Sequence, residues 1–423
     1  MLLDFRNTKF DITIDAPPSK SIYHRELIIR YICGDRSLLT ENGNDNEDIR
    51  ATRAVLRGIN DCITSSDVPD VVTFPCNESG STLRFMIPVA AAFLLGTGNS
   101  QGTSSQPPKL VFETKGRLFD RPVKELADAM APHGITIEKD ESTRNIVVTG
   151  KMTPGEYVID GSVSSQYISG LLMALTLFDE KCRVTVTGEM KSVHYIELTQ
   201  DVLNKYGCPA EREGNVYYTT PCNQGSLDKD MLPEFHVEGD WSNGAFLLCL
   251  REWSDLKVTN LNPDSKQGDR AILDFINVMH DADNNSAITW DCSDIPDITP
   301  YMAVAAAFTF DKSVFTGISR LRIKESDRVM AVRSQLSTIG IRTEETDDSL
   351  TVYGNTQKNN RKDDSGHENP DNPVVLSSFH DHRMAMCAVL IGVILKCRVD
   401  IDDMDCMRKS FPEFLEFLKP YIA

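Results

Sequence analysis

The sequence predicts a mixed α/β protein built from repeated units and divided into two similar domains. An amphipathic helix followed by a glycine and a short strand recurs at residues 48–61, 121–140, 194–213 and 326–345. Other apolar helices, such as those in residues 81–95 and 164–178, lie between these copies. A chain of 423 residues is also longer than one ordinary domain.

The four recurring helices are expected to end at glycine, which adopts the left-handed conformation common after a helix. The predicted end positions are Gly58, Gly134, Gly207 and Gly340. A fifth helix should end near His280, and a sixth lies within residues 411–423. About six units therefore fill the chain, three to a domain.

The domain boundary is expected in the polar segment 219–232, halfway along the repeats. If the six units need a closing strand, the N-terminal strand in residues 10–15 could supply it to the second half. We therefore expect one domain of residues 1–17 plus 224–423, and an inserted domain of residues 18–223.

The net charge of −18 argues against a nucleic-acid or anionic-membrane partner, but not against a small anion bound by a local group of cations. No apolar run approaches the roughly 18 residues that cross a bilayer, and the N-terminus does not resemble a signal peptide. The eleven cysteines are scattered, without a C-x-x-C pair. We expect a cytoplasmic monomer with reduced, buried thiols and neither metal nor cofactor.

Several helix starts in the first half carry groups that suit an anion. Lys20, Ser21 and Arg25 follow two prolines, where they either cap a solvated helix start or bind a phosphate or carboxylate. Gly80 stands at the start of one further helix, and Ser164, Ser165 and Gln166 stand at the start of another. Arg117 and Arg121 precede a third.

Helix starts in the second half add acids as well as cations. Asp297, before an alanine-rich helix, is expected to be a cap or a base for a substrate hydroxyl. Lys324, Glu325 and Arg328 could share one helix face, as a surface ion-pair ladder or as a site. Asp381, His382 and Arg383 precede a buried helix, and Lys409 precedes the last helix. Alternatively, His380 and His382 could be metal ligands.

The recurrence of these groups at helix N-termini is more specific than any one of them. Repeated units would direct the termini into one cleft, where helix dipoles and cations act together on an anion. Five or more cations in so acidic a protein indicate substrates with several negative charges.

In combination and order, "SKS", "SGSTLRF", "SSQ", "DIPD", "KESDR", "DHRMAM" and "KSFP" resemble the 5-enolpyruvylshikimate-3-phosphate synthase family over nearly the whole chain. The resemblance implies two similar domains, each of three βαβαββ repeats, with helices inside, sheets outside and a cleft between domains. It also implies transfer of the enolpyruvyl group of phosphoenolpyruvate to the 5-hydroxyl of shikimate 3-phosphate, with release of phosphate, on the route to chorismate and aromatic amino acids.

The resemblance assigns site residues to each substrate. Those expected to bind shikimate 3-phosphate are Lys20, Ser21, Arg25, Ser164, Ser165, Gln166, Ser192, Tyr195, Asp297 and Lys324. Those expected to bind phosphoenolpyruvate are Lys20, Gly80, Arg117, Gln166, Arg328, Arg383 and Lys409. Asp297 and Glu325 are expected to share the acid and base steps, with Lys20 and His382 stabilising developing charge.

Three positions depart from the family pattern: many members have asparagine where this chain has His24, Glu78 and Arg320. Glu78 would repel phosphoenolpyruvate unless paired, and Arg320 or Arg25 could pair with it. Rival predictions are the sister transferase acting on UDP-N-acetylglucosamine, a P-loop kinase and a non-enzymatic repeat scaffold. The sister transferase has a different opening motif and a loop cysteine that "GRLFDRP" lacks. A P-loop kinase needs the glycines of G-x-x-x-x-G-K-[ST], which are missing before "SKS".

Overall fold

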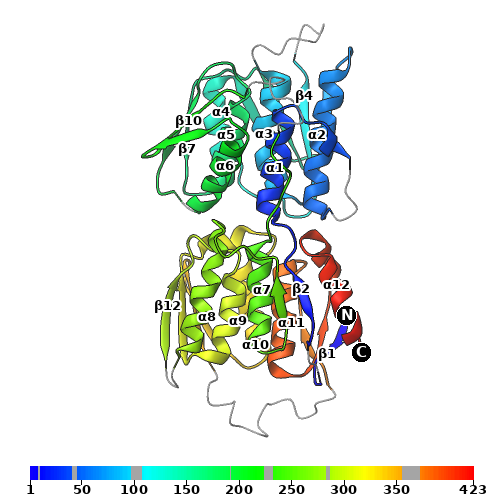
Figure 1. The fold of residues 1–423 in the computed structure, drawn as a ribbon, viewed down its shortest axis with the longest axis vertical. Helices are drawn as coiled ribbons and strands as arrows, with labels where there is room; N and C mark the ends of the chain where they lie inside the picture. The colour runs from blue at the N-terminus through cyan, green and yellow to red at the C-terminus, as the bar shows by residue number, and fades with distance from the viewer. Residues whose placement is uncertain are drawn as a thin grey trace. The chain divides into compact units, whose positions relative to one another are not determined.

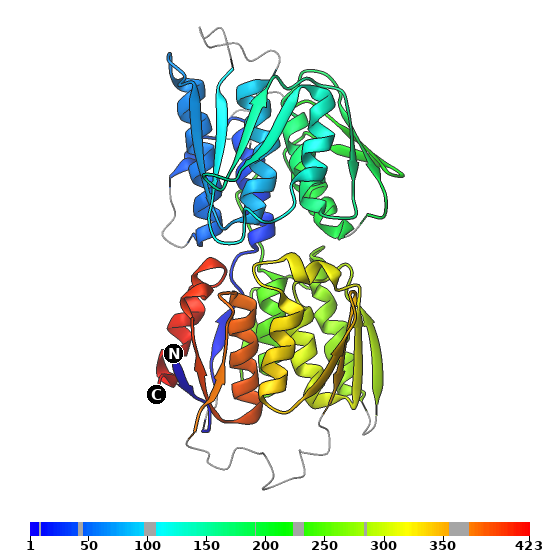
Figure 2. The same cartoon turned by 180° about the vertical axis from the view of Figure 1, so that it is seen from behind.

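The chain folds into two compact units (Figures 1 and 2). The computed structural model describes residues 1–7, 10–40, 45–96, 107–190, 192–222, 232–282, 286–354 and 372–423. Unit 1 comprises Met1–Ser19 and Glu238–Ala423, and unit 2 comprises Lys20–Val237. The domain limit predicted at residues 223 and 224 lies outside the described residues and stays a prediction.

Unit 2 alternates helices with two four-stranded sheets. Its helices are α1 (Lys20–Ile32), α2 (Glu47–Thr64), α3 (Gly80–Leu95), α4 (Lys124–Met130), α5 (Ser165–Leu175) and α6 (Val193–Lys205). Its strands are β3 (Val71–Asn77), β4 (Lys109–Thr114), β5 (Ile135–Asp140), β6 (Asn145–Gly150), β7 (Glu156–Asp160), β8 (Arg183–Thr187), β9 (Ala210–Glu213) and β10 (Val216–Thr219).

Unit 1 contains both chain termini. Its helices are α7 (Trp241–Arg251), α8 (Ile272–His280), α9 (Thr299–Thr309), α10 (Arg328–Thr338), α11 (His382–Leu395) and α12 (Glu413–Leu418), with short 3-10 turns that include η4 (Gly268–Ala271), η5 (Ser319–Ile323) and η7 (Asp405–Lys409). Its strands are β1 (Leu2–Asp4), β2 (Thr13–Asp15), β11 (Lys257–Thr259), β12 (Ala287–Asp291), β13 (Lys312–Thr316), β14 (Arg342–Glu345), β15 (Ser349–Tyr353), β16 (Val374–Leu376) and β17 (Arg398–Ile401).

Three sheets of the described chain share one topology, with orders β3-β4-β6-β5, β7-β8-β10-β9 and β12-β13-β15-β14. In each sheet the first pair is parallel and the other two pairs are antiparallel. The parallel pairs are connected through α3, α5 and α9, because parallel strands require a crossover. The mixed α/β class and the βαβαββ order expected from the sequence are confirmed.

The N-terminal strand closes unit 1, as the sequence predicted. β2 pairs in parallel with β11, with Thr13 opposite Lys257 and Asp15 opposite Thr259. β1 pairs antiparallel with β17, and β17 pairs in parallel with β16 on its other side. The whole of unit 2 is thus inserted in sequence between β2 and α7.

The central helices are buried on nearly all sides, which confirms that helices form the inside of each unit. In α9, every residue from Thr299 to Ala307 is buried. In unit 2, α5 packs closely on α3 at Gly170, where an added Cβ would lie 2.7 Å from the backbone oxygen of Arg84. Among the described residues, no helix is long and apolar enough to span a membrane.

Three of the four predicted helix-ending glycines behave as expected, and one does not. Gly134, Gly207 and Gly340 have positive φ angles of 81°, 74° and 77°. Gly58 instead lies inside α2, which continues to Thr64, so this prediction is wrong. A Cβ at Gly58 would lie 3.0 Å from the Phe74 ring, so the glycine serves close packing of α2 on β3.

Candidate active site

Four helix N-termini of unit 1 lie close together, because α11 packs against α7, α9 and α10 and side chains at these helix starts bond to one another. Arg383, in the first turn of α11, connects three of them. Its Nη1 donates to the backbone oxygen of Ser242 on α7 at 3.2 Å and to the Tyr301 hydroxyl on α9 at 3.1 Å. The helix dipoles therefore add to a common positive potential within this unit.

Arg328, the first residue of α10, is the centre of the charged group in unit 1. Its side chain is only 2% exposed and binds three carboxylates: Asp297 at 2.7 Å, Glu325 at 2.8 Å and Asp381 at 2.8 Å. Burial by itself would lower the pKa of Arg328, but the three carboxylates raise it above its ordinary value. The guanidinium is therefore permanently charged and holds the three acids in place.

Asp297 does not cap α9, so the cap alternative is wrong. The N-cap position belongs to Ile298, which makes no side-chain cap bond. Asp297 Oδ1 instead lies 3.5 Å from Lys324 Nζ, 2.7 Å from Arg328 Nη1 and 4.0 Å from Arg383 Nε. Burial opposes ionisation, but Lys324 and the two arginines hold the pKa of Asp297 well below its usual range.

Lys324 and Glu325 precede α10 rather than sharing a helix face with Arg328, which corrects the ladder prediction. They follow η5, and Asp327 is the N-cap, accepting from the Met330 amide at 3.0 Å. Burial lowers the pKa of Lys324, although Asp297 opposes the shift. Both side chains are partly exposed, at 28% and 16%. They are thus available to a ligand, while Glu325 pairs with Arg328 directly and Lys324 is linked to it through Asp297.

The start of α11 supplies the remaining predicted groups. Asp381 caps the helix through the Arg383 amide at 2.9 Å, and His382 is 2% exposed with Nδ1 3.7 Å from Asp381. His380 is exposed and bonds Asp403 at 2.8 Å. Lys409 is buried at the end of η7, next to Ser410, which bonds Asn243 on α7 at 3.2 Å.

In unit 2, Arg25 is held by neutral oxygens. It is 1% exposed, and no carboxylate contacts it among the described residues. It donates to the backbone oxygens of Ser21 at 2.5 Å and Tyr195 at 2.8 Å, and to the hydroxyls of Thr199 at 2.7 Å and Ser169 at 3.3 Å. Burial lowers the pKa of Arg25 to about 10, so the group stays charged at neutral pH.

Lys20 and His24 connect α1 to α2. Lys20 Nζ lies 2.8 Å from Asp48, which precedes Thr52 by one helical turn. His24 is fully buried, with Nδ1 2.7 Å from the Thr52 hydroxyl, which in turn contacts the Thr82 hydroxyl on α3 at 2.7 Å. Burial lowers the pKa of His24 to about 3, so the imidazole is neutral and serves as a structural link.

The N-termini of α3 and α5 meet through an amide side chain. Gln166 accepts from Arg84 at 2.7 Å and donates to the Ser81 hydroxyl at 2.9 Å. Ser164 caps α5 by accepting from the Gln166 amide at 3.3 Å, so capping explains one of the three polar groups, and Ser165 is buried behind it. At the start of α3, a Cβ on Gly80 would lie 2.5 Å from a terminal nitrogen of Arg121.

Arg117 is the predicted residue that the structure leaves apart. It is exposed in the turn after β4, and no described contact joins it to the other predicted residues of unit 2. Ser192 and Tyr195 start α6, with the Tyr195 amide donating to the Ser192 oxygen at 3.1 Å. Glu78 packs over Gly116, where a Cβ would lie 2.4 Å from its Oε1, and Arg25 does not pair with it.

A family model described as EPSP synthase (3-phosphoshikimate 1-carboxyvinyltransferase) matches residues 6–418. The chain belongs to the EPSP synthase family. The 3-phosphoshikimate 1-carboxyvinyltransferase of Clostridium kluyveri is 31% identical, over 97% of this chain and 94% of that protein. The one of Clostridium novyi is 30% identical, over 95% and 93%.

Solved structures show the same fold. An EPSP synthase from Acinetobacter baumannii has a TM-score of 0.68 at 19% identity, covering 99% of this chain and 98% of that one. The enolpyruvyl transferase NikO from Streptomyces tendae has a TM-score of 0.62 at 13% identity, covering 99% and 97%. The family resemblance inferred from the motifs is confirmed.

The EPSP synthase motifs did not identify every residue of these two groups. Arg84 lies inside "SGSTLRF" but is not among the predicted site residues, and only packing shows that its side chain reaches Gln166. The sequence places Arg121 and Asp381 at helix starts but assigns neither to a substrate. Asp269 on η4 has no motif signal and is buried beside Ser242, whose hydroxyl donates to it. Burial and the nearby Asp297 raise the pKa of Asp269 to about 7.

Proposed function

We propose that this EPSP synthase family member transfers the enolpyruvyl group of phosphoenolpyruvate to the 5-hydroxyl of shikimate 3-phosphate and releases phosphate. Beyond family membership, the proposal is supported by one arrangement in unit 1. Arg328 and Arg383, expected to bind an anion, lie beside Asp297, which Arg328 also connects to Glu325. Anion binding and proton transfer are thus available in one place.

Unit 2 supplies most of the proposed shikimate 3-phosphate contacts. Among the described residues Arg25 contacts the Ser21 and Tyr195 carbonyls but no carboxylate, so its positive charge favours a phosphate bound near these two residues. In this arrangement Arg25 positions its neighbours through their carbonyls. The proposed direct contacts are Lys20, Ser21, Ser164, Ser165, Gln166, Ser192 and Tyr195, with Asp297 and Lys324 on the hydroxyls.

The addition step requires a base and an acid. The 5-hydroxyl oxygen bonds to C2 of phosphoenolpyruvate while its proton passes to Asp297. The methylene carbon C3 takes a proton from Glu325 in its protonated form, which the negative charge of the bound substrates favours. The product is a tetrahedral intermediate with a methyl group. The arginines and Lys409 would hold the phosphate and carboxylate, and Lys20 and His382 would stabilise the charge that develops.

The elimination step reverses the proton movement at C3. The bond between C2 and the phosphate oxygen breaks, and phosphate leaves with the electron pair and with the proton that Asp297 took from the 5-hydroxyl. The methyl group returns a proton to Glu325, so both acids recover their starting forms. The new carbon–carbon double bond completes the enolpyruvyl ether. No redox change occurs, so the reaction needs no redox cofactor.

Substrate binding would also strengthen the base. In the free protein three cations hold the pKa of Asp297 low, which makes it a weak base. Phosphoenolpyruvate would draw Arg328 and Arg383 toward its own anionic groups, and losing these cations raises the pKa of Asp297. The carboxylate thus becomes a better proton acceptor when the second substrate is present.

Because the proposed contacts divide between the two units, we propose that the units close on the substrates. We further propose that the protein works as a monomer in the cytoplasm, without nucleic acid, membrane, metal or cofactor in the reaction. Compaction in small-angle X-ray scattering on adding shikimate 3-phosphate would support closure, and an unchanged profile would contradict it.

A coupled phosphate-release assay with both substrates tests the reaction. Release should require both, and Asp297→Asn and Glu325→Gln should each lower kcat by at least about 100-fold, as expected for acid–base groups. Asp294→Asn, an exposed acid nearby in sequence, is the matched control and should keep turnover. Absence of release with shikimate 3-phosphate would overturn the proposal, and release with UDP-N-acetylglucosamine instead would identify the sister activity.

A further inference from the structure

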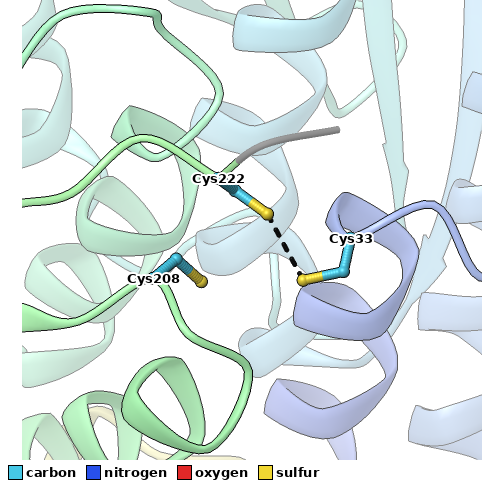
Figure 3. A group of neighbouring side chains, drawn as sticks. All are labelled: Cys33, Cys208 and Cys222. Atoms are coloured by element: carbon cyan, nitrogen blue, oxygen red, sulfur yellow. Dashed lines mark hydrogen bonds between the residues drawn. The ribbon is translucent and has the colours of Figure 1, made fainter. Parts of the chain in front are cut away.

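Three cysteine thiols from distant parts of unit 2 converge in its interior (Figure 3). Cys33 follows the last turn of α1, Cys208 lies between α6 and β9, and Cys222 follows β10. All three Sγ atoms lie within 4.8 Å of one another, and those of Cys33 and Cys222 are 3.3 Å apart. The sequence showed no such group, because Cys33 and Cys222 are 189 positions apart.

The three thiols are buried and their backbones are held in place. Cys33, Cys208 and Cys222 are 2%, 0% and 9% exposed. Their amides donate to the backbone oxygens of Ile29 at 2.9 Å, Leu203 at 3.1 Å and Thr176 at 2.7 Å, respectively. The sulfur positions are therefore fixed by the fold before any ligand arrives, which reduces the entropy lost on binding one.

The three sulfur atoms form one group of potential ligands, and cysteine binds metals as a thiolate. The Cys33 and Cys222 sulfur atoms are close enough to share an S–H hydrogen bond, so a bound ion would take the place of protons already held between sulfur atoms.

We propose that Cys33, Cys208 and Cys222 form a binding site for a thiophilic metal ion, Zn²⁺ or Cu⁺, held by three thiolates. With metal–sulfur bonds of about 2.3 Å, three sulfurs of a tetrahedral site lie about 3.8 Å apart. The observed distances, 3.3 Å between Cys33 and Cys222 and no more than 4.8 Å for the other two pairs, need only small side-chain movements to reach that value. Thiolate sulfur selects both ions over Mg²⁺ or Ca²⁺. On binding, the remaining S–H protons pass to solvent.

Two simpler roles account less well for this geometry. A disulfide would use only two of the three sulfurs and would need an oxidant. Buried cysteine also packs as a small apolar side chain, as Cys62 and Cys76 do in the same unit. In the described part of the chain, however, three potential ligand atoms converge in this way only at Cys33, Cys208 and Cys222.

The ion would connect the end of α1 to the segments that follow α6 and β10. Helix α1 begins with Lys20 and Ser21, so its anchoring at the far end would stabilise the helix that presents them. The sulfurs themselves lie outside the proposed reaction. We therefore expect the ion to raise the stability of unit 2 without being required for turnover.

Metal binding by the reduced full-length protein tests the proposal. The apo protein, kept reduced with a phosphine, would be titrated with Co²⁺ to detect thiolate-to-metal charge-transfer absorption, then with Zn²⁺ and, anaerobically, with Cu⁺ against competing chelators. One ion per chain is expected. At an ion concentration 100 times Kd, the unfolding midpoint should rise by about 5–10 °C.

Single substitutions locate the site. Cys33→Ala, Cys208→Ala and Cys222→Ala should each remove the Co²⁺ charge-transfer band and weaken Zn²⁺ or Cu⁺ binding by at least about 100-fold, as loss of a ligand implies. Cys62→Ala, a buried cysteine of α2 outside the group, should bind as the wild type does. Binding that survives all three substitutions would overturn the proposal.

A measurement on the wild type avoids variants that fail to fold. With Zn²⁺ or Cu⁺ present, mass spectrometry should show slower alkylation of Cys33, Cys208 and Cys222, and an unchanged rate at Cys62. Protection by either ion supports the site and identifies which ion it prefers. Failure of both ions to bind, or formation of a Cys33–Cys222 disulfide without any metal binding by the reduced protein, would overturn it.

Discussion

Arg25 in unit 2 and Arg328 in unit 1 are both buried arginines near helix N-termini, but their surroundings are opposite. Arg25 is surrounded by hydroxyl and carbonyl oxygens of Ser21, Thr199, Ser169 and Tyr195. Arg328 is surrounded by three carboxylates. The pKa of Arg25 is lowered and that of Arg328 is raised, in keeping with this difference.

The comparison indicates that the two units have different roles in the proposed reaction. A buried cation without a carboxylate is under-compensated, so a phosphate placed nearby would gain stabilisation. A cation matched by carboxylates attracts an anion less strongly, but it holds acids in position for proton transfer. In the proposed function, unit 2 would therefore serve mainly binding, and unit 1 would serve both binding and chemistry.

The largest expected effect comes from removing the carboxylate-bound cation. Arg328→Leu leaves three acids without their shared guanidinium, so turnover should fall by at least about 1,000-fold. Unit 1 should lose about 3–5 kcal/mol of unfolding free energy, as when one partner of a buried ion pair is removed. All three tryptophans, Trp241, Trp253 and Trp290, lie in unit 1, so urea unfolding followed by their fluorescence reports this loss.

Arg333→Leu on the same helix is the control for Arg328→Leu. Arg333 pairs with Glu345 near the surface, so its loss should change the unfolding free energy by about 1 kcal/mol or less. Equal effects of the two substitutions would contradict the special role of the buried arginine.

A smaller effect is expected when Arg25, which is held by neutral oxygens, is replaced by a cation of different shape. Arg25→Lys cannot reproduce a planar fork with four bonds, so Ser21 and Tyr195 lose their common support. The KM for shikimate 3-phosphate should rise about tenfold, roughly 1.4 kcal/mol, with little change in kcat. Steady-state kinetics would measure this, with Arg30→Lys on the same helix as control. A fall in kcat alone would remove the proposed distinction between the units.

Unit 2 should lose stability in acid because of His24. Its folded pKa of about 3 lies below the ordinary value of 6.5, so between these values only the unfolded chain binds the proton. Stability should fall as pH drops from 6.5 toward 3, by on the order of 3 kcal/mol, and less so in His24→Asn. Pulse hydrogen exchange of α1 peptides over a urea series would measure it, with exposed His280→Asn as control.

Unit 1 should carry a smaller pH effect of opposite sign through Asp269. Its folded pKa of about 7 exceeds the ordinary 3.8, so between these values the folded chain holds a proton that the unfolded chain has lost. The contribution of Asp269 to stability should decline from pH 4 to 7, by on the order of 2 kcal/mol, and Asp269→Asn should remove this decline. Tryptophan-monitored urea unfolding would compare it with exposed Asp264→Asn, and parallel pH curves for all three proteins would contradict the assignment.

Local sequence patterns predicted the elements of this fold well. The helix ends at Gly134, Gly207 and Gly340 follow from the left-handed backbone that glycine adopts. The pattern failed at Gly58, because a glycine required for packing against Phe74 has the same sequence signature as one that ends a helix. Motifs also led to the family, because their order along the chain is specific even where single motifs are ambiguous.

By itself, the sequence determined the helix and strand order, the family and the helix starts that carry charge, since these depend on spacing between neighbours in the chain. Only the tertiary structure decided that Asp297 binds three cations, that Arg25 contacts no carboxylate in the described chain, and that Cys33, Cys208 and Cys222 converge. The physical reason is that charge compensation and ligand convergence depend on which side chains packing brings within a few ångströms, and residues far apart in sequence carry no local signal of that proximity.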